Sequence, residues 1–369
     1  ARGEITQFVF PLGVVPADVC ELLDALSAEF AGMAAKLDRI TELLKDCMEQ
    51  DDGEIDKTQA ETWFLLFGSA QTRTEAGALC CLYYSRADDP AGIPAARWIT
   101  FNEAAGQPEI SLTTSPVMAA EALEDKLWDA CYGAVLTSAT LTALGSFDFL
   151  AQRCGLPQST HFHRITSPFS YQEAAVLRLP RKGFDPSDSN THTQAIITIL
   201  PTILTEQAGA LVLFSSRRQL QEVQEGLHPA FRRLILAQDD YSKQELLRLH
   251  RLTVDRGEPS IIFGLASLAE GIDLPGKYCT HVVIAKIPFP VPNDPVDATL
   301  GDWVKSRGRN PFQEISVPEA ALRLIQASGR LLRQESDRGT ITILDERLAT
   351  RSYGKGILDS LPPYPREFF

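Results

Sequence analysis

Two arginines in the stretch QASGRLLR, Arg330 and Arg333, are well suited to binding a phosphate group. A helix over 316–333 would present both guanidinium groups on the same face as Gln326, one and two turns after it. A guanidinium stays charged and donates two parallel hydrogen bonds to an oxyanion. Gly329 would cost such a helix about 1 kcal/mol relative to alanine, and we expect it to allow a large anion to approach closely. Paired arginines on helices are common, so this pair alone does not define a site.

Small polar and charged residues follow several apolar runs that we predict to be strands. Two serines and an arginine follow ALVLF, where serine can cap a helix and the helix N-terminus can bind phosphate. The loop GLASLAEGID places two carboxylates around a glycine, and GAVLTSAT ends in hydroxyls that also suit a simple turn. A lysine and a phenylalanine follow HVVIA in a proline-rich segment, which is either a rigid connector or the carrier of an exposed ring that stacks on a nucleobase. The residues at these positions are Ser138, Thr140, Ser215, Ser216, Arg217, Ser267, Glu270, Gly271, Asp273, Lys286 and Phe289.

Apolar runs rich in β-branched residues alternate with helical patterns from about residue 131 onward. This alternation is typical of an α/β fold, in which helices cover both faces of a parallel sheet. Ligands of such sheets bind at the carboxyl ends of the strands, so we expect the residues that follow the strands to lie there. The predicted strands are 133–140, 210–216, 232–238, 259–267, 281–287 and 339–346, and the predicted helices are 141–154, 191–207, 217–227, 241–256 and 316–333.

The first 130 residues follow a different pattern and are strongly acidic. Apolar residues recur at helical spacing over 16–49, as one long or two consecutive helices, and a second helical stretch reaches Tyr84. A loop at 86–94 and short strands at 97–104 and 109–116 follow. This part has 23 acidic and 9 basic residues, a formal net charge of −14, whereas the remainder has 25 and 26 and a net charge of +1. We expect packing roles in the acidic part, and the nearly neutral part can present a basic groove.

The composition of the 369 residues is that of an ordinary folded protein, with 44% hydrophobic residues. No apolar run approaches the roughly 18 residues that a transmembrane helix requires. The seven cysteines show no metal-ligand spacing, which indicates a reducing cytosol and predicts no metal in this chain. The chain begins with neither a signal peptide nor an initiator methionine, so we expect a processed product or a fragment.

The order of the motifs is more specific than any one of them. SAT, a strand that ends in Ser-Ser, a loop with E-G-x-D and then Q-x-x-G-R-x-x-R resemble motifs III to VI of superfamily-2 helicases. The stretches VLTSATL, SLAEGIDLPG, HVVIAKIPFPVPNDP, QASGRLLRQESDRG and RSYGKGILDSLPP are similar to the DinG branch of the XPD-type DNA helicases. The resemblance is close over 131–361, and the helical N-terminal part resembles the arch insertion of that family more weakly.

The resemblance implies a RecA-like motor domain that closes with a second such domain over ATP and Mg²⁺ and moves 5′→3′ along single-stranded DNA. It implies that Arg330 and Arg333 are arginine fingers and that Gln326 positions the attacking water or the γ-phosphate. Nucleotide-binding roles fall on Gly329, Glu270, Gly271 and Asp273, and DNA-binding roles fall on Ser138, Thr140, Ser215, Ser216, Arg217, Ser267, Lys286 and Phe289. The implied division is a partial arch over 1–130, a motif III strand and connector over 131–158, and a helicase C-terminal domain over 159–369.

Three features of that family are absent from the sequence. It has no G-x-x-x-x-G-K-[ST] loop, no D-E-x-H sequence for Mg²⁺ and no four-cysteine iron–sulfur motif. We therefore interpret the chain as the C-terminal half of a helicase, with the iron–sulfur cluster and the first motor domain elsewhere, and we expect VLTSAT to lie at an edge. We expect the chain alone not to hydrolyse ATP.

The expected partners are single-stranded DNA, the other motor domain and a replication or repair protein, with no membrane, in the bacterial cytoplasm. The alternative from a different class is a non-enzymatic module that binds single-stranded DNA or a protein partner. A third alternative is an unrelated α/β ligand-binding enzyme in which the motif order is coincidental.

Overall fold

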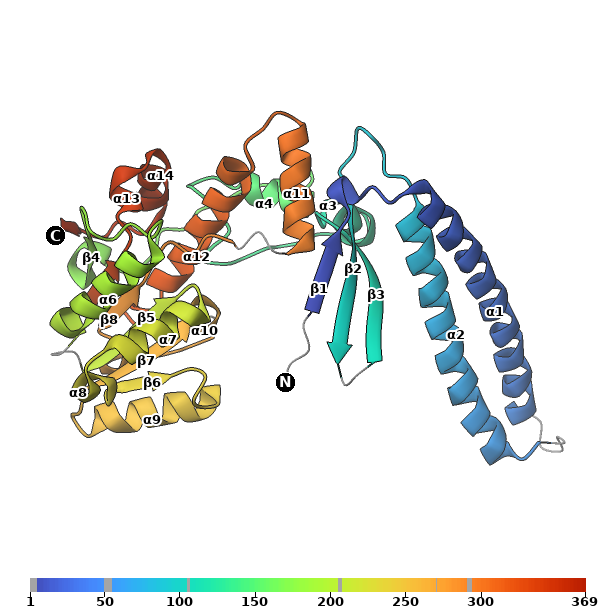
Figure 1. Cartoon of the computed structure of the whole chain (residues 1–369), viewed down its shortest axis with the longest axis horizontal. Coiled ribbons are helices and arrows are strands. Elements are labelled where there is room, and N and C mark those ends of the chain that lie inside the picture. Colours follow the sequence, from blue (N-terminus) through green and yellow to red (C-terminus); the bar gives the residue numbers. More distant parts are fainter. Residues whose placement is uncertain (1–4, 50–54, 105–106, 205–207, 270, 291–293) are drawn as a thin grey trace. The chain divides into compact units, whose positions relative to one another are not determined.

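The computed structural model describes residues 5–49, 55–104, 107–204, 208–269, 271–290 and 294–369, which form two compact units (Figure 1). The hairpin unit comprises residues 1–119 and 291–309, and the sheet unit comprises 120–290 and 310–369. This division differs from the predicted one because 291–309, in the middle of the predicted C-terminal domain, packs with the N-terminal residues.

Two long antiparallel helices, α1 (Ala17–Glu49) and α2 (Lys57–Ser85), give the hairpin unit its name (Figure 1). Buried residues are spaced by seven and then three positions in both helices, at 34, 41 and 44 in α1 and at 74, 81 and 84 in α2. This spacing is that of a two-stranded coiled coil. The predicted helices are confirmed, the first of them as one continuous helix.

A three-stranded antiparallel sheet, a short turn and one further helix complete the hairpin unit. The sheet has the order β1-β2-β3, with β1 (Ile5–Val9), β2 (Ala95–Ala104) and β3 (Gln107–Pro116). The strands β2 and β3 were predicted, and β1 was not. The turn is η1 (Pro11–Gly13) and the helix is α11 (Pro295–Ser306).

Helix α11 is held to the loop between α2 and β2. The Trp303 Nε1 donates to the Gly92 carbonyl at 2.9 Å. The Arg307 Nη2 donates to the carbonyls of Pro90 and Ala91 at 3.0 and 2.9 Å. These bonds explain why a segment distant in sequence belongs to this unit.

The sheet unit is built on seven parallel strands in the order β10-β4-β9-β8-β5-β7-β6. The strands are β4 (Ala175–Leu179), β5 (Gly209–Phe214), β6 (Ile235–Ala237), β7 (Ser260–Leu265), β8 (His281–Ile284), β9 (Gly339–Ile343) and β10 (Arg366–Phe368). The longer helices are α6 (Ser189–Leu204), α7 (Arg217–Gly226), α9 (Lys243–Asp255), α12 (Val317–Ser328) and α14 (Ser352–Ser360). This is the predicted RecA-like α/β fold.

Alternate residues of each central strand supply the two cores of the sheet unit. In β5, Leu211 and Leu213 pack in the core that α9, α12 and α14 also line, whereas Val212 and Phe214 pack with α6 and α7. Because both faces are covered, the strand is apolar at every position, as the sequence pattern predicted.

Short elements connect these parts. They are α3 (Ala120–Leu123), η2 (Glu124–Trp128), α4 (Asp148–Cys154), α5 (Tyr171–Ala174), α8 (Pro229–Arg232), α10 (Ala266–Ala269), η3 (Gly276–Tyr278), η4 (Phe312–Ser316) and α13 (Arg347–Thr350).

The strand predicted over 133–140 is wrong. These residues have no regular structure, and no described strand pairs with them. Val135 is 93% exposed. β-Branched residues favour a strand only where a neighbouring strand gives them packing and hydrogen bonds, and the described residues provide none here. The helix predicted over 141–154 is only half present, because a turn with Leu144 and Gly145 at positive φ precedes α4.

Candidate functional site

The helix that carries Gln326 ends earlier than predicted. Helix α12 stops at Ser328, and Gly329 is its C-cap, with φ at −65°. The Gly329 N–H still bonds to the Ile325 carbonyl at 2.9 Å, and the chain then turns. The expectations of a helix to residue 333 and of a glycine in its interior are therefore wrong, and the two arginines lie on the segment that leads from α12 to β9.

Both arginines bond to the segment 271–276, which contains the second half of the E-G-x-D motif. The Arg330 Nη1 donates to the Ile272 carbonyl at 3.1 Å, and its Nε donates to the Gln326 carbonyl at 3.2 Å. The Arg333 Nε donates to Asp273 Oδ1 at 2.7 Å, and the side chains of this pair are 35% and 64% exposed. The structure thus brings together two motifs that are about sixty residues apart in sequence.

This cluster does not lie at the carboxyl ends of the strands. The segment 271–276 carries the chain back from the end of β7 to the start of β8, and the arginines precede the start of β9. A parallel sheet requires such a return between consecutive strands, and this return passes the end of α12. Arg330, Arg333 and Asp273 therefore lie away from the edge at which ligands of such sheets were expected to bind.

Asp337 fixes the arginine segment, and the sequence reasoning missed it. The residue is 3% exposed, and its carboxylate accepts from the N–H groups of Gly276, Arg333 and Gln334 at 3.0, 2.7 and 2.8 Å. Two of these donors lie three and four positions before it, so the carboxylate closes a turn where the helix would otherwise continue. An aspartate between the arginines and a predicted strand was the available signal.

The residues after β5 and β7 do lie at the carboxyl ends of neighbouring strands. Ser216 caps α7 by accepting from the Gln219 N–H at 3.3 Å, so the N-cap interpretation describes the observed contact. The Ser215 Oγ is buried and has no hydrogen-bond partner among the described residues. Arg217 pairs with Asp239 at 3.4 Å and remains 59% exposed, and Ser267, after β7, is exposed.

Lys286 follows β8 at the same edge of the sheet. Its side chain is half-buried. Burial lowers the pKa of its ammonium group, and the positive charge of Arg347 lowers it further, whereas Asp345 opposes both effects. Lys286 therefore places a cation at this edge of the sheet, and burial makes its charged form less favourable than in water.

The expectation that Phe289 offers an exposed ring is wrong. The ring is half-buried among Phe312 and Tyr353, with ring centroids 5.1 and 5.7 Å away. The Arg347 guanidinium lies over it at 5.3 Å from the centroid. An apolar ring next to two other aromatic rings is better packed than solvated, so the Phe289 ring packs within the sheet unit.

The carboxylate of Asp345 anchors the same segment, and the sequence reasoning missed this residue too. Asp345 is fully buried at the end of β9 and accepts from the Ile287 N–H at 2.9 Å. Arg347 donates to both of its oxygens, from Nε at 2.9 Å and from Nη2 at 2.7 Å. The backbone that follows Lys286 is thereby tied to the end of the neighbouring strand.

The remaining predicted residues are scattered. Glu270 lies outside the described residues. Gly271 has φ at 75°, and a Cβ there would lie 3.0 Å from the Lys243 Nζ. Ser138 and Thr140 bond to each other, hydroxyl to hydroxyl at 3.3 Å, in the exposed segment before α4.

The described part of the chain offers neither a metal-ligand cluster nor a membrane-spanning helix. No group of three or more His, Cys, Asp or Glu side chains there is arranged to hold a metal ion. None of the helices found there combines the length and apolar character needed to cross a bilayer.

Comparisons with known proteins show which proteins this chain is similar to. Residues 199–364 match the family described as the helicase C-terminal domain. The chain is 40% identical over 280 residues to the ATP-dependent DNA helicase DinG of Photobacterium profundum, which covers 74% of this chain and 40% of that protein. It is 33% identical over 373 residues to the ATP-dependent DNA helicase DinG of Shigella flexneri, which covers 99% of this chain and 51% of that protein. Residues 199–364 therefore form a domain similar to the helicase C-terminal domain, in a chain that is similar to DinG helicases over most of its length.

A solved structure with a distant sequence has a similar fold. A structure named XPD_Helicase aligns with a TM-score of 0.55 and 13% identity, over 98% of this chain and 65% of that one. At this identity the likeness concerns the fold. The chain spans about half the length of the curated relatives that it matches.

Proposed function

We propose that this chain is the C-terminal part of an ATP-dependent DNA helicase of the DinG/XPD type, which moves 5′→3′ and acts in repair or replication in the bacterial cytoplasm. Its helicase C-terminal domain supplies Arg330 and Arg333 to an ATP that another motor domain holds. The observation that carries this proposal is the bonding of both arginines to the 271–276 segment. This bonding joins the arginines that we assign to the nucleotide to the segment between β7 and β8. The residues that follow the strand ends belong to the same unit.

Arg333 fits the role of an arginine finger by its geometry. Its carboxylate partner is 64% exposed, and an ion pair in water holds a guanidinium only weakly. A doubly charged γ-phosphate can therefore replace Asp273 at the guanidinium. Fingers of this kind increase phosphoryl transfer by about 10³- to 10⁵-fold.

Arg330 is held more firmly and has a second role in the proposal. It bonds to two carbonyls, of Ile272 and Gln326, and so joins the end of α12 to the E-G-x-D segment. A change at the nucleotide would be transmitted through it to that segment. Gln326 and Gly329 let this end of the helix approach the γ-phosphate, and Glu270, Gly271 and Asp273 couple the state of the nucleotide to the DNA path.

The proposed path of single-stranded DNA crosses the carboxyl ends of β8, β5 and β7, which are neighbours in the sheet. Ser216, Arg217 and Ser267 contact phosphates there, and Lys286 adds a cation. Ser215, whose hydroxyl is buried, joins them when its side chain turns toward the DNA. Backbone contacts of this type bind DNA without reading its sequence. Phe289 shapes this edge by packing beneath it and does not stack on a base.

The exposed segment before α4 fits a strand that pairs with the sheet of the other motor domain, which would bring Ser138 and Thr140 to the DNA. Val135 is 93% exposed although it is apolar, as an unpaired strand would be. We assign the binding of Mg²⁺ and the iron–sulfur cluster to the rest of the parent protein. The isolated chain, which lacks a phosphate-binding loop, then hydrolyses no ATP.

The test compares variants of the parent helicase. Arg330→Ala and Arg333→Ala are expected to lower DNA-stimulated ATP hydrolysis at least 10³-fold and to leave the affinity for single-stranded DNA within about twofold. Arg248→Ala removes an equally charged side chain from an exposed pair on α9 and serves as the matched control. Equal losses of hydrolysis and DNA binding would contradict the finger role, and robust phosphate release by the isolated chain would contradict its proposed inactivity. Unwinding of duplexes with a 5′ tail but not a 3′ tail tests the polarity.

A further inference from the structure

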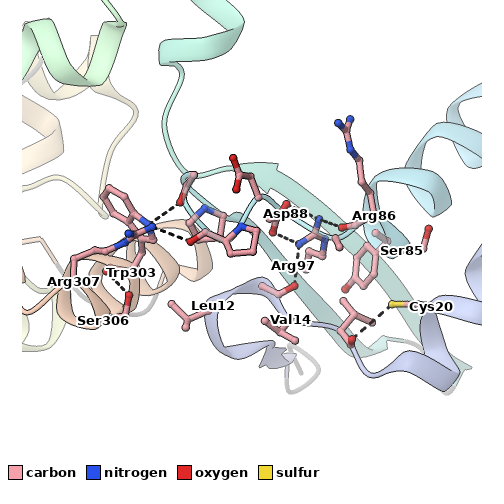
Figure 2. Close-up of a pocket in the computed structure, with 18 residues that line it drawn as sticks. Leu12, Val14, Cys20, Ser85, Arg86, Asp88, Arg97, Trp303, Ser306 and Arg307 are labelled. Atoms are coloured by element: carbon pink, nitrogen blue, oxygen red, sulfur yellow. Dashed lines mark hydrogen bonds and ion pairs between the residues drawn. The ribbon is translucent and has the colours of Figure 1, made fainter.

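A cavity of about 370 Å³ lies within the hairpin unit, between η1, the loop that follows α2 and helix α11 (Figure 2). Cavities of small-molecule sites span about 300–1,000 Å³, so this one can hold a ligand. Its walls include the apolar side chains of Leu12, Val14, Pro90, Pro94 and Trp303. No residue assigned to the nucleotide or to the proposed DNA path lines it.

The buried ion pair in its wall offers no free donor. Arg97 is 3% exposed and pairs with Asp88, to which Nη1 donates at 2.6 Å and Nη2 at 3.0 Å. Its other N–H groups donate to the carbonyls of Gly13, Tyr83 and Arg86 at 2.9, 3.0 and 2.8 Å. A guanidinium has five N–H groups, and all five are used. The ion pair is thus a fixed wall of the cavity and offers no free N–H donor to a ligand.

Two other arginines line the cavity and make it less acidic than its surroundings. Arg86 is exposed, and its side chain has no hydrogen bond or ion pair among the described residues; Figure 2 shows it extending away from Asp88. Arg307 lies with its guanidinium carbon 5.7 Å from the Trp303 ring centroid. The lining holds three arginines and two aspartates, a formal net charge of +1, whereas the hairpin unit has 22 acidic and 11 basic residues and a net charge of −11.

The backbone at the floor of the cavity is in an unusual conformation. Leu12 has φ at 53° and Gly13 at 68°. A Cβ on Gly13 would lie 2.0 Å from the Ala95 carbonyl oxygen. Residues in the left-handed region persist only where their surroundings enforce them, and they concentrate at ligand sites. Here the bond from Arg97 to the Gly13 carbonyl enforces the conformation.

We infer that this cavity binds one unstacked base of single-stranded DNA, with Trp303 and the prolines against the base and with Arg86 and Arg307 near its phosphates. The inference rests on the proposed function for the source of the DNA. Aromatic and apolar walls with a basic rim form the common platform for bases in sequence-independent binding. Because Arg97 and Asp88 satisfy each other, the cavity accepts every base alike, and it adds a DNA contact outside the motor.

The experiment measures how the 369-residue chain binds two labelled 20-nucleotide strands, oligo-dT and the same backbone with abasic sites. Trp303→Ala is expected to weaken binding of oligo-dT about 5- to 150-fold and to remove its preference over the abasic strand. Trp303→Phe, which keeps a ring but loses the bond to Gly92, retains most of the preference. Arg86→Ser, a change at an exposed side chain, reduces the salt dependence of binding by a slope of about 0.7.

Arg217→Ser separates this inference from the proposed function. It removes a cation from the proposed path and should weaken both strands equally, with the preference for bases unchanged. Wild-type affinity in Trp303→Ala overturns the inference, and an apolar peptide side chain then becomes the better occupant. Loss of the preference in Arg217→Ser but not in Trp303→Ala overturns it as well. The ATPase result for Arg333→Ala bears on the proposed function only.

Discussion

The Arg333 guanidinium is bonded to the Asp273 carboxylate at 2.7 Å, and at least a third of each side chain faces solvent, at 35% and 64%. An exposed pair of this type contributes about 0.2–1 kcal/mol. The ion pair therefore orients the Arg333 side chain but stabilises that orientation only weakly. In the proposed mechanism the aspartate occupies the place that the γ-phosphate takes when ATP is bound.

Replacing Asp273 by asparagine in the parent helicase tests this exchange. The variant keeps the shape of the side chain but removes its charge, so Arg333 is released more easily. We expect ATP hydrolysis without DNA to rise by up to about fivefold, and the stimulation by DNA to fall correspondingly. Steady-state hydrolysis with and without oligo-dT measures both. If the ratio of the hydrolysis rates with and without DNA is unchanged, the ion pair between Arg333 and Asp273 is not broken during turnover.

Asp337→Asn tests whether the backbone of the arginine segment must be fixed. Asparagine retains one acceptor oxygen and places an NH₂ group against N–H donors that the carboxylate now satisfies. We expect a loss of about 1–3 kcal/mol in the free energy of unfolding and a lower kcat for ATP, with DNA affinity unchanged. Asp359→Asn, at a 52% exposed carboxylate, is the control and should change stability by less than about 0.5 kcal/mol. A kcat equal to that of the wild type would mean that Asp337 supports the fold alone.

Phe289→Ala tests the corrected role of the ring. Removal of a half-buried aromatic side chain from the cluster with Phe312 and Tyr353 should cost about 2 kcal/mol, less than the roughly 3–5 kcal/mol of a fully buried one. Urea denaturation measures this cost. DNA affinity should fall less than it does in Lys286→Ala; a larger fall in Phe289→Ala would favour base stacking after all.

Acid should destabilise the sheet unit before its carboxylates titrate. Burial, together with the charge of Arg178, lowers the pKa of His281 from 6.5 to about 4, so the folded protein holds this imidazole neutral. The unfolded chain binds the extra proton below about 6.5, and stability is lost as the pH falls from there to about 4. The slope is about 1.4 kcal/mol per pH unit for this residue. Buried His192 and His250, whose pKa values are also lowered, act in the same direction.

Denaturant unfolding at pH 7.5, 6.5, 5.5 and 5.0 measures this dependence. His281→Gln keeps a polar group near Thr342 and removes the titrating one, so its slope should be smaller by about 1.4 kcal/mol per pH unit. A variant slope equal to that of the wild type would show that His281 is not neutral in the folded protein.

The central strands could be predicted from the sequence because burial on both faces leaves a continuous apolar run. β7, β8 and β9 lie within predicted strands, and β5 begins one residue before the predicted one. β4 carries Arg178 as the fourth of its five residues and β10 has three exposed residues, so neither has the run that marks a buried strand. Segment 133–140 has an apolar run but no partner strand among the described residues, so it forms no strand.

Only the site residues that belong to short sequence motifs could be predicted. The family resemblance assigned both Arg333 and Asp273 to the nucleotide site, but neither the resemblance nor the spacing predicted the contact between them. The buried carboxylates of Asp337 and Asp345 act through backbone N–H groups, which leave no residue pattern. The cavity beside Trp303 depends on residues about 290 positions apart, and no local pattern could show it.

The excursion that forms α11 leaves the sheet unit after Phe289 and returns just before Phe312, and these two rings lie 5.1 Å apart. The two ends of this excursion are therefore held at the same point of the sheet unit. The point at which they meet lies three residues after Lys286, which follows β8. A movement of α11 that pulls on these ends would therefore bear on the residues that we place along the DNA.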